Sequence, residues 1–137
     1  MKELFDVHCH MVPGVDDGAA DLEESLEMLK MQHEDGVRKI IITPHYRRRM
    51  FETPAKKVHE QFLKLQEAAK KEYPDMSLYL GCELHSNMDL QDILEKRKYV
   101  TMAGSSYVLL EFSEGDSAQH IRERVYNVLS CGYEPII

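Results

Sequence analysis

Short apolar runs alternate along the chain with longer segments in which apolar residues recur every three to four positions. The apolar runs predict strands over residues 4–8, 37–43, 77–84 and 107–112, and a further strand beginning in "EPII" near the end. The first of them is expected to be a short buried strand. The periodic segments predict helices over 21–35, from Thr53-Pro54 to before Pro74, near 88–96 and over 117–130.

The expected helices carry boundary signals and apolar stripes of their own. Asp21 is expected to cap the first helix, with Glu24 at the capping-box position and Gly36 as the stop. Thr53-Pro54 reads as a cap followed by a first-turn proline, and Gly132 ends the last helix. The inward-facing residues are expected to be Leu22, Leu26 and Leu29; Val58, Phe62, Leu65 and Ala69; and Ile121, Val125 and Val128.

Alternation of strand and helix predicts repeated βαβ units and an α/β fold with a parallel sheet. Five predicted strands fit either a small open sheet or about two thirds of a barrel. The length of 137 residues suits one domain over residues 1–137.

Composition and charge argue against several classes of function. A formal net charge of −7 argues against a nucleic-acid partner, which would need a basic face. No apolar run is long enough to span a bilayer, so no membrane insertion is expected, and the start leaves no room for a signal peptide. The 3 cysteines have no paired spacing, which favours reduced thiols and a cytoplasmic location.

Imidazoles and carboxylates follow the predicted strands one after another. In parallel α/β folds the site lies at the carboxyl ends of the strands. The residues expected at that rim are His8 and His10, Asp17 in the first loop, His45, Glu83, His85 and Glu111. Neutral imidazoles with carboxylates suit manganese, iron or zinc in a catalytic site. The sequence therefore predicts a metal centre at this rim.

Neighbouring residues of the rim are expected to differ in role. Alternate residues of a strand share a face, so His8 and His10 point together and Cys9 packs on the other side. Of Asp16 and Asp17, one is expected to ligate and the other to cap the turn.

Other histidines are expected to lie outside the metal set. His85 is expected to contact substrate or to support a metal ligand. His33, His59 and His120 lie in charged helical stretches and are expected to be solvated.

Three arginines follow His45 in "YRRRM". Arg47, Arg48 and Arg49 read either as a solvated basic loop or as an anion-binding loop, because guanidinium groups bind phosphate in bidentate fashion. Beside a metal site, the second reading suggests a phosphorylated substrate.

Taken in order, "DVHCHMVPGVDDGA", "IITPHY", "GCELH", "VLLEF" and "GYEPII" resemble the PHP (polymerase and histidinol phosphatase) superfamily. The DDGA segment and the basic loop resemble most the bacterial tyrosine-protein phosphatases of capsule and exopolysaccharide operons. The resemblance implies the N-terminal portion of a distorted (β/α)7 TIM-like barrel.

The same resemblance implies up to three metal ions, usually manganese or iron. A metal-generated hydroxide would attack phosphotyrosine, with no side-chain nucleophile. His8, His10 and Glu83 would hold one metal, Glu83 and Glu111 a second, and Asp17 and His45 the third. The implied substrate is the phosphotyrosine-bearing tail of a bacterial tyrosine kinase that controls polysaccharide chain length.

The family pattern continues into a His-Pro-Glu-Arg segment and a later Asp-x-His, and the sequence ends before both. We therefore expect a fragment or a truncated product that retains at most one well-occupied metal, has negligible activity alone and self-associates. The alternatives are a phosphoesterase for a small ester such as histidinol phosphate, a sugar phosphate or a nucleotide, and a non-catalytic metal- or partner-binding protein.

Overall fold

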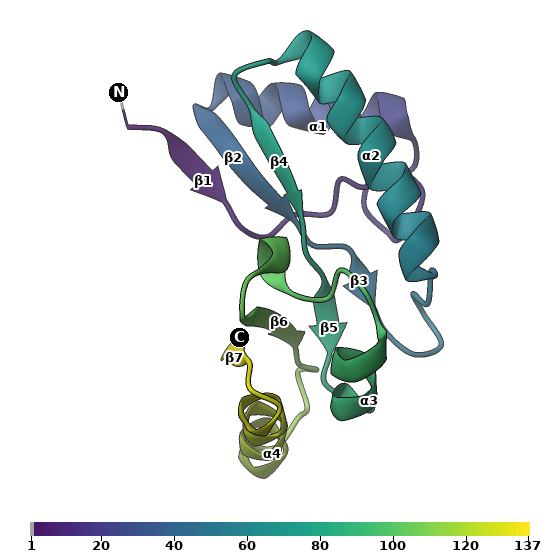
Figure 1. Ribbon diagram of the computed structural model, residues 1–137, viewed down its shortest axis with the longest axis vertical. Coiled ribbons are helices and arrows are strands. Elements are labelled where there is room, and N and C mark those ends of the chain that lie inside the picture. The colour runs from purple at the N-terminus through teal and green to yellow at the C-terminus, as the bar shows by residue number, and fades with distance from the viewer. Residues whose placement is uncertain (1) are drawn as a thin grey trace.

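A computed structural model, which describes residues 2–137, shows parallel strands with flanking helices (Figure 1). The elements in chain order are β1 (Leu4–Asp6), α1 (Leu22–Glu34), β2 (Val37–Ile42), β3 (His45–Tyr46), α2 (Ala55–Glu72), β4 (Ser77–Leu80), β5 (Glu83–His85), α3 (Leu90–Lys96), the 3-10 turn η1 (Met102–Gly104), β6 (Tyr107–Glu111), α4 (Ala118–Ser130) and β7 (Glu134–Ile136).

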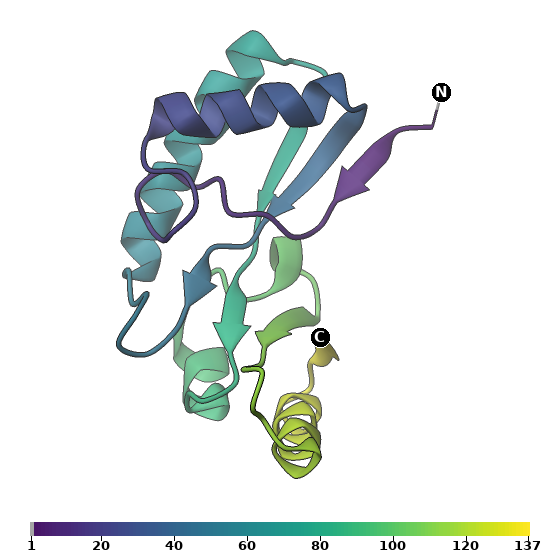
Figure 2. The same ribbon diagram turned by 180° about the vertical axis from the view of Figure 1, so that it is seen from behind.

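The strands form a sheet of order β1-β2-β4 and a second of order β3-β5-β6-β7, and every pairing is parallel. The predicted α/β class with a parallel sheet is confirmed. Over residues 2–137 the strands do not close into a barrel, because β1 and β7 are edge strands with one neighbour each. Figure 2 shows them on separate parts of the molecule.

The strand predicted over 77–84 is wrong as a single element, because a bend divides it into β4 and β5. The strand predicted over 37–43 is confirmed as β2, but a bend after Ile42 leads to a further strand, β3, which contains His45 and was not predicted. Pro44 supplies no N–H to a ladder, and Gly81 lies so close to Met102 that a Cβ would stand 3.0 Å from its Sδ. Hydrogen bonds nevertheless cross both bends, since Gly81 N donates to Ile42 O at 2.8 Å and Glu83 N to Pro44 O at 3.0 Å. The second segments therefore keep the register of the first, since Ile42 pairs with Leu80 and, three residues further along both strands, His45 pairs with Glu83.

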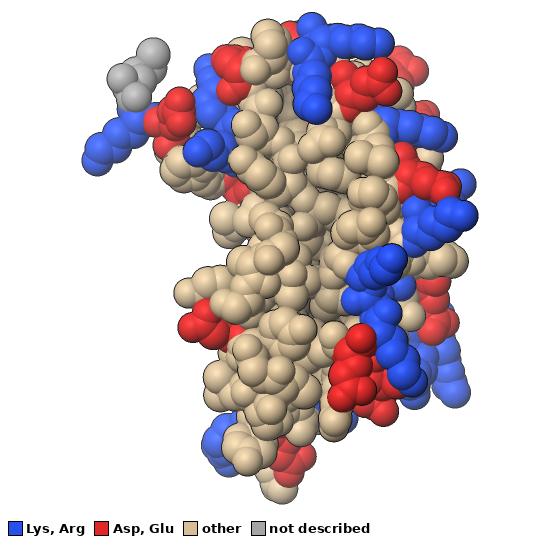
Figure 3. All heavy atoms as spheres, viewed as in Figure 1, with Lys and Arg blue, Asp and Glu red and all other residues tan. Residues whose placement is uncertain are grey.

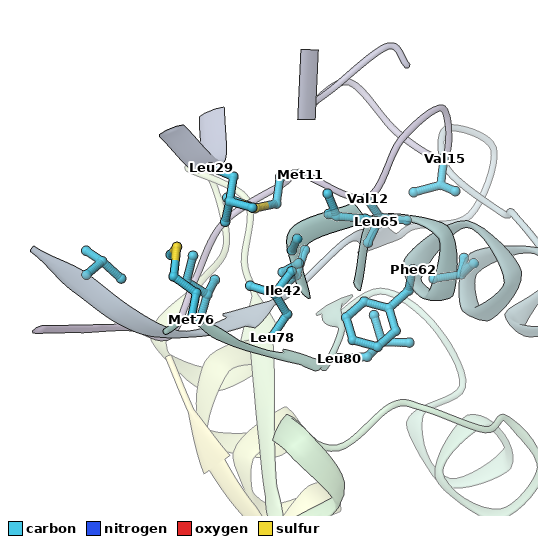
Figure 4. Close-up of a cluster of buried hydrophobic side chains, with 14 residues drawn as sticks. Met11, Val12, Val15, Leu29, Ile42, Phe62, Leu65, Met76, Leu78 and Leu80 are labelled. Carbon is cyan, nitrogen blue, oxygen red and sulfur yellow. The ribbon is translucent and has the colours of Figure 1, made fainter. Parts of the chain in front are cut away.

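The larger apolar core lies between the β1-β2-β4 sheet and helices α1 and α2 (Figure 4). The stripe predicted for α2 is confirmed, because Val58, Phe62, Leu65 and Ala69 are all buried. A second cluster lies beneath α3 and α4. There Val128 is buried as expected, whereas Ile121 and Val125 are only half-buried.

Helix boundaries agree with the sequence at α1 but not at α2. The Asp21 carboxylate accepts from Glu24 N at 2.9 Å, and Gly36 follows the helix with φ +91°. The predicted Thr53 cap is wrong: α2 starts after Pro54 without a side-chain cap bond. Thr53 Oγ1 instead donates to Val15 O at 2.9 Å, which ties the start of α2 to the first loop.

The expectation of a buried first strand is also wrong. Leu4 is 49% exposed and Phe5 60%, because β1 has a neighbour on one side only and the helices cover the opposite face of the sheet. Figure 3, which has the viewpoint of Figure 1, shows a broad surface with few charged atoms between charged margins. Phe5, Val7, Ile41 and Tyr79 line a shallow apolar hollow on the uncovered sheet face. None of the helices within residues 2–137 is long and apolar enough to cross a membrane.

Candidate metal centre

Side chains from the segment after β1, the first residues of β3 and β5 and the last residue of β6 meet at one rim, together with the first loop. Their ligand atoms form three groups, and the atoms of each group lie within 4.8 Å of one another: His8, His10 and Glu83; His10, Asp17 and His45; and His45, Glu83 and Glu111. All six residues expected at the metal centre therefore lie together.

Glu83 stands at the middle of the cluster. Its Oε1 lies 2.7 Å from His8 Nε2, and its Oε2 lies 2.7 Å from His45 Nδ1 and 3.7 Å from His10 Nε2. This position follows from the sheet order, since β5 lies between β3 and β6 and pairs His45 with Glu83 and His85 with Glu111.

Three buried atoms of this cluster have no hydrogen-bond partner among residues 2–137: His45 Nδ1, Glu83 Oε2 and Glu111 Oε2. They lie close together, with Glu111 Oε2 3.3 Å from His45 Nδ1, but without hydrogen-bond alignment. Unpaired buried polar atoms are costly, and two carboxylates at one buried point repel each other. A bound cation would resolve both problems, so the residues present fit a metal ion.

Asp16 orients the cluster from outside it, a role the sequence analysis did not foresee. Its Oδ1 accepts from Gly18 N at 2.9 Å, and its Oδ2 accepts from His45 N at 3.0 Å and lies 3.1 Å from His10 Nδ1. Burial acts to raise the pKa of Asp16, but these bonds outweigh it and hold the pKa below its ordinary value. The hydrogen bond that the His10 ring donates to the Asp16 carboxylate in turn raises the pKa of His10. Asp16 is thus the turn-capping residue of the pair, and it leaves His10 Nε2 for a metal.

Asp17 is the exposed member of the pair, with 64% of its side chain accessible and Oδ1 3.5 Å from His45 Nε2. The turn that presents it requires glycine at the next position. A Cβ on Gly18 would stand 2.0 Å from the carbonyl oxygen of His10.

Cys9 packs against the larger core, which confirms that it points away from the histidine pair. Burial, aided by the charge of Asp6, raises the pKa of its thiol to about 12. At that value it is a neutral thiol and a poor metal ligand. Cys9, Cys82 and Cys131 are all free.

An aromatic stack supports the imidazoles and was also missed from the sequence. The His45 ring stacks on two others: the His10 ring, at 4.4 Å between ring centroids, and the Phe51 ring, at 5.1 Å. Phe51 is positioned by a small hairpin, because Arg47 and Phe51 exchange backbone hydrogen bonds of 2.8 and 2.9 Å. A phenylalanine six residues after a histidine carries no sequence signal for this contact.

The three arginines of that hairpin point to different places. Arg47 Nη1 lies 3.7 Å from Glu111 Oε1, beside the metal cluster. Arg48 and Arg49 are exposed, and Arg49 has φ +65° at the tip of the turn. The structure therefore brings only Arg47 to the cluster directly.

His85 is 1% exposed and lies behind the rim. Its Nδ1 accepts from Asn87 N at 3.2 Å, so its Nε2–H donates to Ser113 Oγ at 3.0 Å. With both nitrogens engaged and the ring buried, this geometry favours the supporting role among the two expected for His85.

The expectation that three helical histidines are solvated is wrong. His33 bonds Asp75 at 3.0 Å, His59 stacks on Tyr99 at 4.2 Å, and His120 lies 3.3 Å from Ser86 Oγ. All three are half-buried. Partners distant in sequence cover them, which helical periodicity alone does not show.

Parallel strands with a cluster of imidazoles and carboxylates at one rim define an α/β protein with a candidate metal site. The family model described as "Capsular polysaccharide synthesis, CpsB/CapC" matches residues 4–137, and the chain belongs to this family.

Relatives and a solved structure agree with that placement. The chain is 39% identical over 134 residues to the tyrosine-protein phosphatase CpsB of Streptococcus pneumoniae, covering 98% of this chain and 55% of that protein. It is 29% identical to the tyrosine-protein phosphatase YwqE of Bacillus subtilis, of which it covers 53%.

The crystal structures of YwqE from Bacillus subtilis and CpsB from Streptococcus pneumoniae, described as unique metal-dependent tyrosine phosphatases, include a similar chain. The TM-score is 0.85 at 29% identity, covering 96% of this chain and 53% of that one. The chain thus spans about half the length of the relatives it matches.

Proposed function

We propose that these residues belong to a metal-dependent protein-tyrosine phosphatase of capsule or exopolysaccharide synthesis. The observation that carries the proposal is the convergence of His45 Nδ1, Glu83 Oε2 and Glu111 Oε2, buried and unpaired, beside two further imidazoles. Tyrosine-phosphatase relatives of the same family support the reaction. The substrate is the phosphotyrosine tail of a bacterial tyrosine kinase, and the fold is part of a (β/α)7 barrel.

His8, His10 and Glu83 would hold one metal, Glu83 and Glu111 a second, and Asp17 and His45 the third. Manganese is the proposed metal, with iron or zinc as substitutes, because the donors are nitrogen and oxygen without thiolate. Bound divalent ions lower the pKa of coordinated water and neutralise charge on a phosphoryl group.

The protein's own residues position and shield this chemistry. Asp16 holds His10 by its Nδ1, and Phe51 packs on His45, so the imidazoles are oriented before a metal binds. Arg47, near Glu111, is placed to contact an anionic substrate group, and Arg48 and Arg49 extend the basic loop. His85 supports the rim from behind through Ser113. The free thiols support a cytoplasmic location.

Hydrolysis of a phosphotyrosine peptide, a phosphoserine peptide and histidinol phosphate tests the proposal, with Mn²⁺ added and with chelator as control. The assay uses this chain and a longer protein that contains it. We expect Mn²⁺-dependent hydrolysis by the longer protein, with phosphotyrosine preferred, and negligible hydrolysis by this chain alone. Faster hydrolysis of histidinol phosphate would instead establish a small-ester phosphatase, and chelator-resistant activity would contradict a metal-dependent reaction.

A further inference from the structure

A polar hollow lies next to the metal rim, and no role in the chemistry accounts for it. It has a volume of about 400 Å³ and is open to solvent. Its lining comes from the hairpin after β3, the start of α3 and the middle of α4, namely Arg48, Asn87, Met88, Asp89, Leu90, Gln91, Arg124 and Asn127.

Two arginines line this hollow, Arg48 and Arg124, and neither forms an ion pair with a carboxylate among residues 2–137. The arginine ion pairs formed among residues 2–137 are those of Arg38 with Asp75 and of Arg47 with Glu111. Arg48 and Arg124 take part in neither. In a chain of net charge −7, two guanidinium groups without an ion-pair partner in one hollow give a local excess of positive charge, which favours an anion there.

The other polar groups of the hollow offset this charge only in part. The Asp89 carboxylate keeps its negative charge and, as the cap of α3, accepts from Asp92 N at 3.1 Å, so two guanidinium groups share the hollow with one carboxylate. The side-chain amide of Gln91 donates to Glu95 at 3.3 Å. The amides of Asn87 and Asn127 remain to donate to an anion beside the arginines.

The hollow is tied to the metal cluster at two points. Arg48 is three residues beyond His45, a path of at most about 11 Å between Cα atoms. Asn87 is four residues beyond Glu83 and donates its backbone N–H to His85. An extended peptide advances about 3.3 Å per residue, so a side chain two to four positions from a residue at the metal centre reaches the hollow.

We propose that the hollow between Arg48 and Arg124 binds an anionic side chain of the peptide substrate, two to four residues from the phosphotyrosine at the metal centre. The bound group is a carboxylate or a second phosphate ester. This inference rests on the proposed function and adds a specificity site to it. The enzyme would thus select tyrosines in acidic or multiply phosphorylated segments.

The test measures binding of labelled peptides by fluorescence anisotropy, with Mn²⁺ present. The reacting position carries either a non-hydrolysable phosphonate mimic of phosphotyrosine or phenylalanine. The position three residues away, before or after it, carries glutamate, the same phosphonate mimic or glutamine. The double variant Arg48→Gln, Arg124→Gln is compared with Arg122→Gln, an exposed arginine of α4 that does not line the hollow.

We expect the wild-type protein to bind an anionic flank about three- to tenfold more tightly than glutamine, on at least one side. The preference should fall to about onefold in the double variant and persist in Arg122→Gln. Preference for glutamate, the mimic or both identifies the source of the anion. Equal binding of all flanks, or a preference that survives in the double variant or is lost in Arg122→Gln, would overturn the inference. Equal binding of the mimic and phenylalanine at the reacting position would instead count against the proposed function.

Discussion

At the scale of single residues, the position of His10 depends on Gly18, whose backbone lies too close to His10 for any side chain to fit between them. The backbone of Gly18 packs against the carbonyl oxygen and Cβ of His10, while the neighbouring Asp16 carboxylate bonds both the Gly18 N–H and the His10 ring. The turn therefore fixes the backbone and the ring of His10 together. The conformation of the first loop therefore determines the orientation of the His10 ring.

Gly18→Ala should destabilise the protein by about 1–3 kcal/mol, because its Cβ would overlap the His10 backbone. Urea denaturation followed by circular dichroism measures the loss. Gly115→Ala is the matched control, since a Cβ there meets nothing within 4 Å. Equal stability of the two variants would contradict the close packing of the first loop.

At the scale of elements, the sequence was informative about helices and about the order of the strands. The spacing of Val58, Phe62, Leu65 and Ala69 predicts the buried face of α2 because it depends on local geometry alone. The bend after Leu80 was not predicted, since the apolar run continues through it, and neither was the short strand β3 that follows the bend after Ile42. Those bends depend on contacts between segments far apart in the chain, such as Gly81 against Met102.

The metal residues were predictable for a related reason. Parallel strands bring their carboxyl ends to one rim, and this rule grouped His8, His45, Glu83 and Glu111, although His45 and Glu83 begin β3 and β5 just beyond the ends of β2 and β4. The orienting contacts of Asp16 and Phe51 with the imidazoles were not predicted. Their contacts depend on loop conformations, which have no periodic pattern in the sequence.

A polar junction joins α1, β2 and the loop before β4, away from the metal rim. Asp75 bonds His33 at 3.0 Å and pairs with Arg38 at 3.1 Å. The His33 bond, followed by the charges of His33 and Arg38, lowers the pKa of Asp75 below its ordinary value of 3.8. A carboxyl group with a lowered pKa stabilises the fold above its unfolded pKa, and that contribution is lost as the pH falls through the folded value.

Asp75→Asn should therefore reduce the Tm at pH 7 and narrow the difference in Tm between pH 7 and pH 3. Differential scanning calorimetry at the two pH values measures both effects. Asp35→Asn is a suitable control, because Asp35 is exposed and ends the same helix, α1. If the pH dependence of Asp75→Asn equals that of the wild-type protein, the junction does not contribute to acid sensitivity.

At the scale of the whole molecule, the helices cover one face of the β1-β2-β4 sheet and leave the other accessible (Figure 1). Leu4, Phe5 and Val7 are about half exposed or more on β1 and just beyond it, and Ile137 after β7 is 72% exposed. Parallel strands normally have both faces and both edges covered. An open sheet with apolar edges favours association.

We predict that this chain self-associates at tens of micromolar, measured by light scattering after size-exclusion chromatography, and that Phe5→Glu shifts it toward monomer. Glutamate at this position can pair with Lys39, which lies over the Phe5 ring at 5.2 Å, so the fold should tolerate it. Tyr126→Glu, at a 69% exposed site on α4, should leave association unchanged. A wild-type chain that stays monomeric would contradict the prediction.

Calorimetric titration of the chelator-treated chain with Mn²⁺ determines whether the rim cluster binds a metal ion. His8→Ala removes an imidazole 2.7 Å from Glu83, whereas Cys9→Ser alters the neighbouring side chain that packs against the core. We predict that the wild-type chain binds at least one Mn²⁺, that His8→Ala weakens binding by at least about tenfold, and that Cys9→Ser binds as the wild type does. Circular dichroism confirms that each variant is folded. Unchanged Mn²⁺ affinity in folded His8→Ala, or an equal loss in folded Cys9→Ser, would contradict the account.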